Sequence, residues 1–291
     1  MLPERDGSVE SLQTVTYKLL ALDVDGTLVR RDGSIDQEDL QAIRRLRAAG
    51  VTITIATGRL FSGTREIARR AGISGPIACV DGSHIVDVER GEHHYARTIA
   101  GAHAATLRGI AERHDAACFL FAQDMIVHDD AGASFAPYVQ TWSPAIERVD
   151  RVTSHPYWDH EHGVLALVAV GSESQIRDAE AAIQAELAET AFVISFPVGR
   201  QSDAFGMVVR AAGPTKGTAI TWLASHHGCS PQDVVAVGDW LNDVPMFQAA
   251  GRSFAMRQAP AAVRAAATDT LEAHGDEGGG VAEAIWRAFG I

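Results

Sequence analysis

The feature that most limits the fold of this chain is a close alternation of strand and helix patterns near its start. The apolar run YKLLALDV, residues 17–24, stops abruptly at Asp25-Gly26, as a buried parallel strand would. Residues 36–50 follow as a helix that begins with an Asp cap and closes on Gly. The runs 51–56 and 77–80 predict two further strands, separated by a second helix. This alternation with short loops predicts a parallel α/β sheet.

The middle of the chain has a different pattern, and the opening pattern returns after it. The middle is richer in histidine and polar loops, and its apolar runs predict a small separate sheet. We therefore expect an α/β fold with a doubly wound, parallel, Rossmann-like core over residues 17–83 and 206–291. Residues 84–205 are expected to form an inserted α+β domain. Residues 1–16 are polar and acidic and are expected to be a disordered tail.

Composition argues against several classes of partner. The 25 basic and 37 acidic side chains give a net charge of −12, which disfavours general nucleic-acid or membrane-surface binding. The three cysteines are widely spaced, so a disulfide scaffold or a cysteine zinc site is not expected. The longest apolar run, residues 164–170, is far short of the roughly 20 residues that cross a bilayer. With no apolar signal core at the start, a cytoplasmic protein is expected. The sequence says nothing of the oligomeric state.

Two aspartates end the first predicted strand. Alternate residues on a strand share a face, so Asp23 and Asp25 are expected to lie near each other. Two neighbouring carboxylates repel unless a cation or a shared proton lies between them, and Mg²⁺ prefers such hard oxygen ligands. One carboxylate could then act as a nucleophile and the other as a general acid/base. An ordinary Asp-Gly turn after a strand explains the pair about equally well.

A second strand end carries Thr57-Gly58-Arg59. A hydroxyl, a flexible backbone and a guanidinium at a strand-to-helix junction suit the oxyanions of a phosphate. A threonine helix cap with a surface arginine is the simpler explanation of this motif alone. Lys216 opens a later helix, and a single lysine in that position is usually solvated.

A third strand end carries GDWLND, residues 238–243. Asp239 and Asp243 follow the strand with Asn242 between them, and such a cluster can hold Mg²⁺ through one or two carboxylates and water. Helix capping by Asn242 or Asp243 is the alternative. Ligands of open parallel sheets bind beyond the carboxyl ends of the strands, so the three strand ends together indicate one site.

The order of these motifs, DVDGT, TGR, Lys216 and GDWLND, resembles that of the haloacid dehalogenase (HAD) superfamily of phosphohydrolases. The long gap between Arg59 and Lys216 has room for a cap domain, as in the type with a C2 cap, particularly the Cof-like phosphatases. Two loops depart from the family pattern. Residues 81–83 read Asp-Gly-Ser where Asn-Gly-Ala is usual, and residues 256–259 read Met-Arg-Gln-Ala where Met-Gly-Asn-Ala is usual. In relatives both loops lie near the substrate edge, so the departures bear on substrate choice.

The resemblance implies a phosphoric monoester hydrolase that uses Mg²⁺ and acts on a small phosphorylated metabolite, with a sugar phosphate as the expected substrate. It implies that Asp23 is the nucleophile that forms an aspartyl-phosphate, and that Asp25 is the general acid/base. The residues that would neutralise, bind or orient the phosphoryl group are Thr57, Lys216, Gly58, Arg59 and Asn242. The residues that would hold the metal are Asp23, Asp25 through its backbone carbonyl, Asp239 and Asp243.

Two alternatives to a phosphatase stay open at this point. A phosphotransferase resembling phosphomannomutase would pass the phosphoryl group to a second hydroxyl, and the motifs do not separate it from a hydrolase. A catalytically idle binding protein could keep the same fold. The second acid, Asp25, disfavours a dehalogenase, because a halide leaving group needs no proton. The histidines of the inserted segment could bind a transition metal, although a solvated or substrate-edge role is expected for them.

Overall fold

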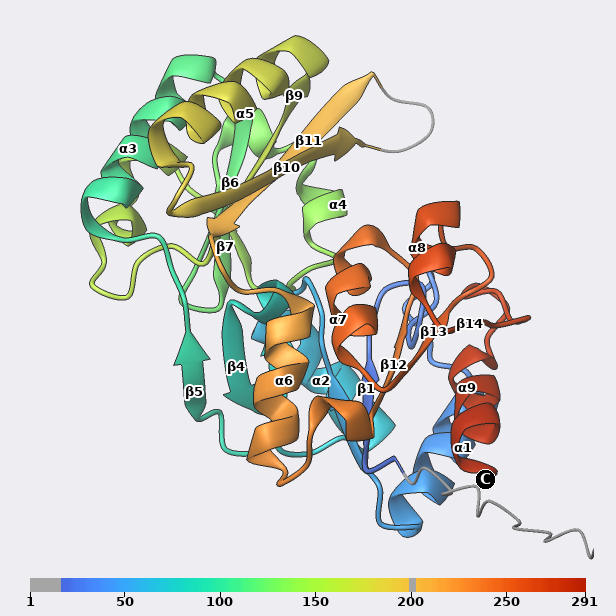
Figure 1. Ribbon diagram of the computed structural model, residues 1–291. Coiled ribbons are helices and arrows are strands. Elements are labelled where there is room, and N and C mark those ends of the chain that lie inside the picture. Colours follow the sequence, from blue (N-terminus) through green and yellow to red (C-terminus); the bar gives the residue numbers. More distant parts are fainter. Residues whose placement is uncertain (1–16, 199–202) are drawn as a thin grey trace, which may run out of the picture.

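The computed structural model describes residues 17–198 and 203–291, and the predicted tail at residues 1–16 lies outside them (Figure 1). Its core is a five-stranded sheet in which all neighbouring strands are parallel. In sheet order the strands are β14 (Asp269–Thr270), β13 (Arg252–Ala255), β12 (Val234–Gly238), β1 (Leu19–Leu22) and β2 (Thr52–Ile55). The strand β1 is buried along its whole length, as its apolar sequence predicts. The parallel α/β core is confirmed.

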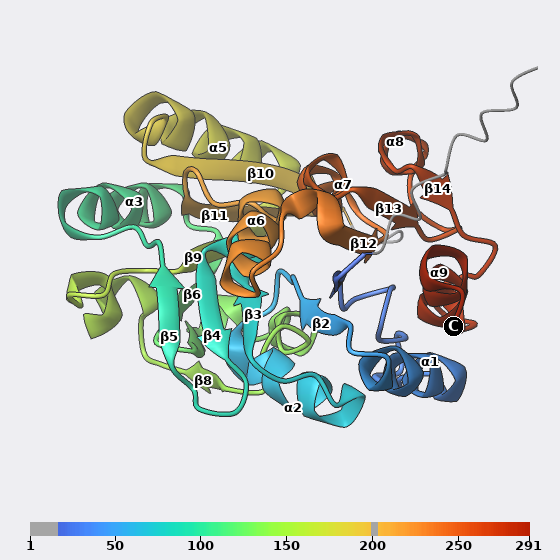
Figure 2. The same ribbon diagram turned by 60° about the horizontal axis from the view of Figure 1, so that its bottom comes forward.

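Helices cover both faces of this sheet (Figures 1 and 2). One face packs against α1 (Gln37–Ala48), α2 (Phe61–Ala71) and α9 (Gly280–Phe289). The other face packs against α6 (Lys216–His226), α7 (Val244–Ala249) and α8 (Ala261–Ala266). The side chain of Asp36 accepts a hydrogen bond from Glu38 N and caps α1, as predicted. The core is therefore doubly wound.

A second, six-stranded sheet forms a separate cap region. In sheet order its strands are β10 (Ala191–Pro197), β11 (Ala204–Ala211), β9 (Ala166–Ser172), β6 (Ala117–Ala122), β7 (Met125–His128) and β8 (Ile146–Arg148). The long helices α3 (Gly101–His114) and α5 (Glu173–Leu187) cover the face of this sheet that points away from the core (Figure 1). The short helix α4 (Ala136–Val139) lies between cap and core. The predicted inserted α+β region is confirmed.

A three-stranded antiparallel sheet, β3 (Pro76–Cys79), β4 (His84–Asp87) and β5 (His93–Ala96), continues the core beyond β2. A parallel bridge between Ala56 and Ala78 joins it to the end of β2. The sequence prediction began the inserted domain at residue 84 and ended it at 205. We propose boundaries near residues 97 and 212 instead, because β4 pairs with β3 of the core and β11 pairs with β9 of the cap through Arg210.

The remaining short elements are 3-10 helices: η1 (Val80–Gly82), η2 (Asp130–Gly132), η3 (Val152–Ser154), η4 (Pro156–Asp159), η5 (Pro231–Asp233) and η6 (Leu241–Asp243). Within residues 17–198 and 203–291, no helix combines the length and the apolar character that a bilayer crossing requires.

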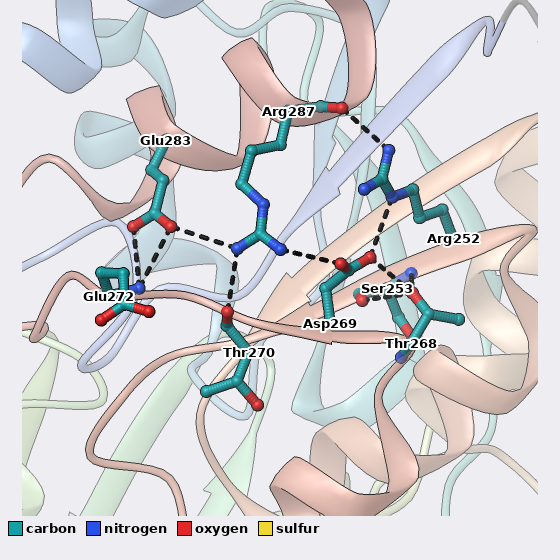
Figure 3. A network of polar contacts seen from close by, with 8 residues as sticks. All are labelled: Arg252, Ser253, Thr268, Asp269, Thr270, Glu272, Glu283 and Arg287. Carbon is teal, nitrogen blue, oxygen red and sulfur yellow. Dashed lines mark hydrogen bonds and ion pairs between the residues drawn. The ribbon is translucent and has the colours of Figure 1, made fainter.

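Ion pairs hold the last helix against the edge of the core sheet (Figure 3). Arg287 on α9 donates to Asp269 Oδ1 at 2.8 Å and to the carbonyl of Thr270 at 2.9 Å, so it binds the edge strand β14. Arg252 on β13 donates to the other Asp269 oxygen at 3.0 Å and to the Arg287 carbonyl at 2.8 Å. This network fixes β14, which has only two residues, without involving the site described next.

Candidate active site

Three carboxylates meet where the central strands of the core end. Asp23 follows β1 directly, and its N–H extends the ladder to the Val237 carbonyl at 2.9 Å. Asp239 follows the neighbouring strand β12, and Asp243 ends η6 just beyond it. One oxygen of each of these three aspartates lies within 4.8 Å of the other two. The two acidic strand ends singled out in the sequence therefore form one cluster.

Two glycines make this close approach possible. Gly26 has a φ of +77°, and a Cβ there would lie 2.4 Å from Asp239 Oδ2. A Cβ on Gly238 would lie 2.4 Å from the carboxyl group of Asp243. A side chain at either position would push the carboxylates apart, so both glycines are part of the geometry of the cluster.

Lys216 lies between two of the carboxylates. Its Nζ donates to Asp23 Oδ1 and to Asp243 Oδ1, both at 2.6 Å, and its side chain is buried. Thr215 caps the helix that begins at Lys216, which fixes where the lysine enters the site. Burial opposes the charge on Lys216, but Asp23 and Asp243 together raise the pKa of its ammonium group above the usual value. Lys216 is therefore a permanent cation in the cluster.

The cluster still carries more negative than positive charge. Burial, and then the charges of the other aspartates, raise the pKa of Asp23 well above its usual value against the opposing effect of Lys216. Burial and the charge of Asp243 raise the pKa of Asp239 to about 7. Carboxylates that hold protons so firmly are stabilised in their charged form by an added cation.

The donor set fits a hard divalent cation. Both oxygens of Asp243 are already used, one by Lys216 and the other by the N–H groups of Asp239 at 2.8 Å and Trp240 at 2.9 Å. Asp23 Oδ2 and Asp239 Oδ1 receive no hydrogen bond from the described part of the chain. These two oxygens are open to a metal, and an all-oxygen set suits Mg²⁺. The Asp25 backbone carbonyl stays a predicted metal ligand.

The carboxylate of Asp25 lies outside the cluster and is held by Arg59. Arg59 Nε donates to Asp25 Oδ2 at 2.8 Å, and Nη2 pairs with Oδ1, so the ion pair is bidentate. Asp25 is half-exposed, whereas the arginine is mostly covered. Thr57 is buried at the end of β2, and its hydroxyl accepts from Arg59 N at 3.2 Å. The predicted phosphate-binding arginine is thus paired with the predicted general acid/base in this structure.

Asn242 is held by a residue that the sequence analysis did not assign to the site. Its Nδ2 donates to Asp81 Oδ1 at 2.8 Å, and the ideal Cβ position of Gly58 lies within 4 Å of both side chains. Asp81 has a φ of +51°, which is rare for a residue other than glycine. Arg210, on the cap strand β11, pairs with the other Asp81 oxygen at 3.7 Å. Asp81 therefore connects the cap to the site.

A second residue that was not assigned is Gln258, in the loop after β13. Its Nε2 donates to the Gly26 carbonyl at 2.7 Å and to Asp239 Oδ2 at 3.2 Å. Its Oε1 accepts from Gly275 N at 2.9 Å, which fixes the amide orientation. The signal was present in the sequence, because Asp81 and Gln258 both lie in the loops that depart from the pattern of the resembled family.

A comparison with protein families matches residues 20–285 to the haloacid dehalogenase-like hydrolases. The chain belongs to this family. It is therefore a hydrolase of the HAD superfamily, as the order of motifs predicted.

Individual relatives agree with this membership. A Yersinia pseudotuberculosis protein named HMP-PP phosphatase is 26% identical over 255 residues, which cover 84% of this chain and 85% of that protein. A haloacid dehalogenase-like hydrolase from Bacteroides thetaiotaomicron has a TM-score of 0.79 at 24% identity and covers 94% of this chain and 100% of its own. A HAD subclass IIB sugar phosphatase has a TM-score of 0.72 at 24% identity, with coverages of 94% and 99%. These structural likenesses confirm the HAD fold.

In this HAD-family hydrolase the cap touches the core beside the site. Ser62, in the first turn of α2, donates its N–H to Asp124 Oδ1 at 2.7 Å and its hydroxyl to the Asp124 carbonyl at 2.8 Å. Leu60 N donates to the Trp142 carbonyl at 3.1 Å. Because Arg59 precedes Leu60, these cap loops border the Asp25–Arg59 pair.

The histidines supply no second metal cluster in the part of the chain that the structure describes. There the only group of three or more ligating side chains with this spacing is that of the three aspartates. His84 and His93 do meet, with ring nitrogens 2.7 Å apart, but as a hydrogen-bonded pair. Trp158 is buried inside the cap, where its indole N–H donates to the Val152 carbonyl at 3.0 Å.

Proposed function

We propose that this HAD-family hydrolase is a Mg²⁺-dependent phosphatase that hydrolyses a small phosphorylated substrate through an aspartyl-phosphate on Asp23. The observation that carries the proposal is the buried Lys216 shared by Asp23 and Asp243 beside two open carboxylate oxygens. A carboxylate repels a phosphate dianion unless positive charge lies between them, and this arrangement supplies that charge. The name of the Yersinia relative, HMP-PP phosphatase, supports a phosphate ester as substrate.

In the first half-reaction we propose that an Asp23 oxygen attacks phosphorus as the bond to the leaving oxygen breaks. Asp25, in its protonated form, gives its proton to that oxygen, and the alcohol leaves. Arg59 pairs with the ionised Asp25 carboxylate outside the cluster, so we propose that this pair separates before the protonated Asp25 faces the leaving group. Lys216 and the Thr57 region offset the charge of the phosphoryl oxygens.

In the second half-reaction Asp25 takes a proton from water, and the resulting hydroxide attacks the phosphorus of the acyl phosphate. The bond to Asp23 breaks, inorganic phosphate leaves, and both carboxylates return to their starting state. Asn242 is in place to orient the phosphoryl group because Asp81 fixes its amide. Trp142 and Asp124 of the cap are hydrogen-bonded to the start of α2 and the residue before it. We propose that these contacts limit the access of bulk water to the reacting phosphoryl group.

Asp23 and Asp239 would hold the metal, with Asp243 setting the positions of Lys216 and of the backbone around Asp239. When bound, Mg²⁺ supplies positive charge that offsets both the carboxylates and the phosphoryl oxygens. A sugar phosphate is one candidate substrate, and the name of one structural neighbour, a sugar phosphatase, supports it.

Chelation should abolish activity and Mg²⁺ should restore it. The assay is release of inorganic phosphate from acetyl phosphate, a small phosphorylated probe without a bulky leaving group. After exhaustive treatment with EDTA and removal of the chelator, turnover should fall by at least about 10³-fold, since a metal and its charge offset are lost. Addition of Mg²⁺ should recover it. Full turnover after chelation would remove the metal from the proposal.

Metal affinity should depend on pH in a defined direction. In the metal-free protein the pKa of Asp239 is about 7, so below pH 7 this carboxyl group is mostly protonated and a proton must leave before the metal binds. The apparent affinity for Mg²⁺ should therefore fall about fivefold between pH 7 and pH 6 and change little above pH 8. Calorimetric titration in two buffers of different ionisation enthalpy would count the released protons. Equal affinities at pH 6 and pH 8 contradict the assignment.

A further inference from the structure

Exposed apolar side chains gather around the proposed active site. Seven large hydrophobic side chains are exposed among the described residues: Tyr95, Tyr138, Phe192, Ile194, Trp240, Leu241 and Trp286. Single exposed hydrophobic residues are ordinary on any protein surface, but a cluster marks a binding site. Trp240 and Leu241 of the core directly follow the cluster residue Asp239 in the chain, and Phe192 and Ile194 of the cap connect to the same loop through Arg210 and Asp81.

The core contributes Trp240 and Leu241, which are 54% and 47% exposed. They stand between Asp239 and Asn242, so the same loop carries a metal-site carboxylate, two apolar side chains and the orienting amide. The Trp240 N–H donates to Asp243 at 2.9 Å, which fixes the backbone of the loop. An exposed indole held on a fixed backbone beside a reactive cluster is available to a ligand.

The cap contributes Phe192 and Ile194 on the edge strand β10, which are 41% and 39% exposed. Their neighbours on the strand face the cap helices. Val193 packs against the hydrophobic core of the cap, and the Ser195 hydroxyl donates to Glu180 of α5 at 2.7 Å. Because side chains alternate along a strand, Phe192 and Ile194 project from the opposite face of the sheet. That face looks toward the core (Figures 1 and 2).

A chain of direct contacts joins these two apolar pairs across the site. The Arg210 guanidinium lies over the Phe192 ring at 4.4 Å and pairs with Asp81 at 3.7 Å. Asp81 in turn accepts from Asn242, which is the neighbour of Leu241. Ile194 pairs in register with Val208, so it continues the Phe192 side of the same surface. Phe192 on the cap is thus connected through Arg210 and Asp81 to Asn242, the residue that would orient the phosphoryl group.

Tyr138, on the short cap helix α4, lies near the segment of the core that carries Arg59. Its ring packs edge-on against Trp142 at 5.5 Å, and the Trp142 carbonyl accepts from Leu60, next to Arg59. Arg59 holds the proposed general acid Asp25. The leaving oxygen that Asp25 would protonate thus lies toward a surface made of aromatic and aliphatic groups.

We infer that the substrate of this hydrolase is a phosphomonoester whose leaving alcohol carries an aromatic ring, which packs between Trp240 and the Phe192–Ile194 surface. The inference rests on the proposed phosphatase function and names its substrate class. A flat ring gains contact with aromatic and branched side chains on both sides. A sugar would turn several hydroxyl groups toward this surface, and hydroxyl groups that lose water without a new partner are costly to bind.

The test compares benzyl phosphate with glucose 6-phosphate. Both are esters of primary alcohols, so their intrinsic reactivities are similar and a difference in kcat/KM reports recognition of the leaving group. We expect kcat/KM to be about tenfold or more higher for benzyl phosphate. Trp240→Ala should lower kcat/KM about tenfold for benzyl phosphate and less than about twofold for glucose 6-phosphate. Trp286→Ala, a matched change on α9 where the indole is 67% exposed, should change neither value.

The outcomes separate this inference from the function on which it rests. Turnover of acetyl phosphate, which has no ring, reports the chemistry alone. If acetyl phosphate is hydrolysed but glucose 6-phosphate is preferred over benzyl phosphate, the aromatic leaving group is refuted and the phosphatase stands. The aromatic leaving group is likewise refuted if Trp240→Ala lowers kcat/KM equally for both esters. If no phosphorylated probe is hydrolysed with Mg²⁺ present, the proposed function itself is wrong.

Discussion

Replacement of Asp23 by asparagine should reduce phosphate release by about 10⁵-fold, the largest effect that we expect for any single change. The amide keeps the shape of the carboxylate but cannot attack phosphorus, because it lacks the negative charge of the nucleophile. Its oxygen can still accept from Lys216, which also remains paired with Asp243, so the fold should be retained. The measurement is steady-state release of inorganic phosphate from acetyl phosphate at saturating Mg²⁺.

A matched control is Asp32→Asn, the same substitution on an exposed loop carboxylate that bonds Ser34. It should leave turnover within about twofold of the parent protein, as is usual for a surface substitution. Thermal unfolding of both variants would show that the fold is kept. An Asp23→Asn protein that folds and retains about a tenth of the parent activity would show that another group attacks phosphorus.

The core of the fold was predictable because its signals are local. Each buried parallel strand is a short apolar run, and the run 17–24 stops at Asp25-Gly26 just where β1 gives way to the site loop. The cap of α1 at Asp36 and the start of α6 at Lys216 are likewise encoded within a few residues. The meeting of Asp23 with Asp239 follows once β1 and β12 are neighbours, which the order of the motifs implied through the family resemblance.

The path of the chain after β3 was not predictable in the same way. The run 77–80 is followed by Asp81-Gly82, as the run 17–24 is followed by Asp25-Gly26, but here the chain reverses at once and β4 pairs antiparallel with β3. The reversal uses positive φ at Val80, Asp81 and Gly82. Asp81-Gly82 is a turn signal, whereas a positive φ is unusual for the β-branched Val80. The prediction therefore placed β4 in the inserted domain.

The contacts of Asp81 and Gln258 depend on tertiary structure alone. Asp81 meets Arg210 only because β11 delivers the arginine from the cap, and no local pattern links two residues so far apart in the chain. Gln258 reaches Gly26 and Asp239 only because β13 lies next to β12. The sequence marked both loops as unusual, but only the fold supplies their partners.

Removal of the Lys216 charge should have the second largest effect, on stability as well as on activity. Lys216→Met keeps the apolar stem of the side chain but leaves Asp23 and Asp243 without their shared cation. Breaking a buried ion pair from one side costs about 3–5 kcal/mol, and we expect a loss of that order in the free energy of unfolding of the metal-free protein at pH 8. Turnover should fall about 10³-fold, as for loss of a charge that stabilises the transition state.

The loss of stability should shrink when the pH is lowered. Burial already raises the pKa of Asp23 in the parent protein, and without the opposing effect of Lys216 that pKa rises further. A carboxyl group whose folded pKa exceeds its unfolded pKa destabilises the fold increasingly as pH rises above the unfolded value, and protonation relieves the cost. The deficit of Lys216→Met should therefore be smaller at pH 5 than at pH 8, and saturating Mg²⁺ should also reduce it. Urea unfolding of the parent protein and of Lys216→Met, at pH 5 and pH 8 and with and without Mg²⁺, measures this loss of stability.

Lys18→Met is the matched control, because Lys18 pairs with Asp233 at 3.5 Å while its side chain is 60% exposed. An exposed ion pair contributes at most about 1 kcal/mol, so this variant should unfold near the parent midpoint at both pH values. If Lys216→Met were as stable as Lys18→Met in the metal-free protein at pH 8, the carboxylates around Lys216 could not be charged there. The cluster would then lack the negative charge that makes a divalent cation its natural ligand, and the proposed metal site would lose its physical basis.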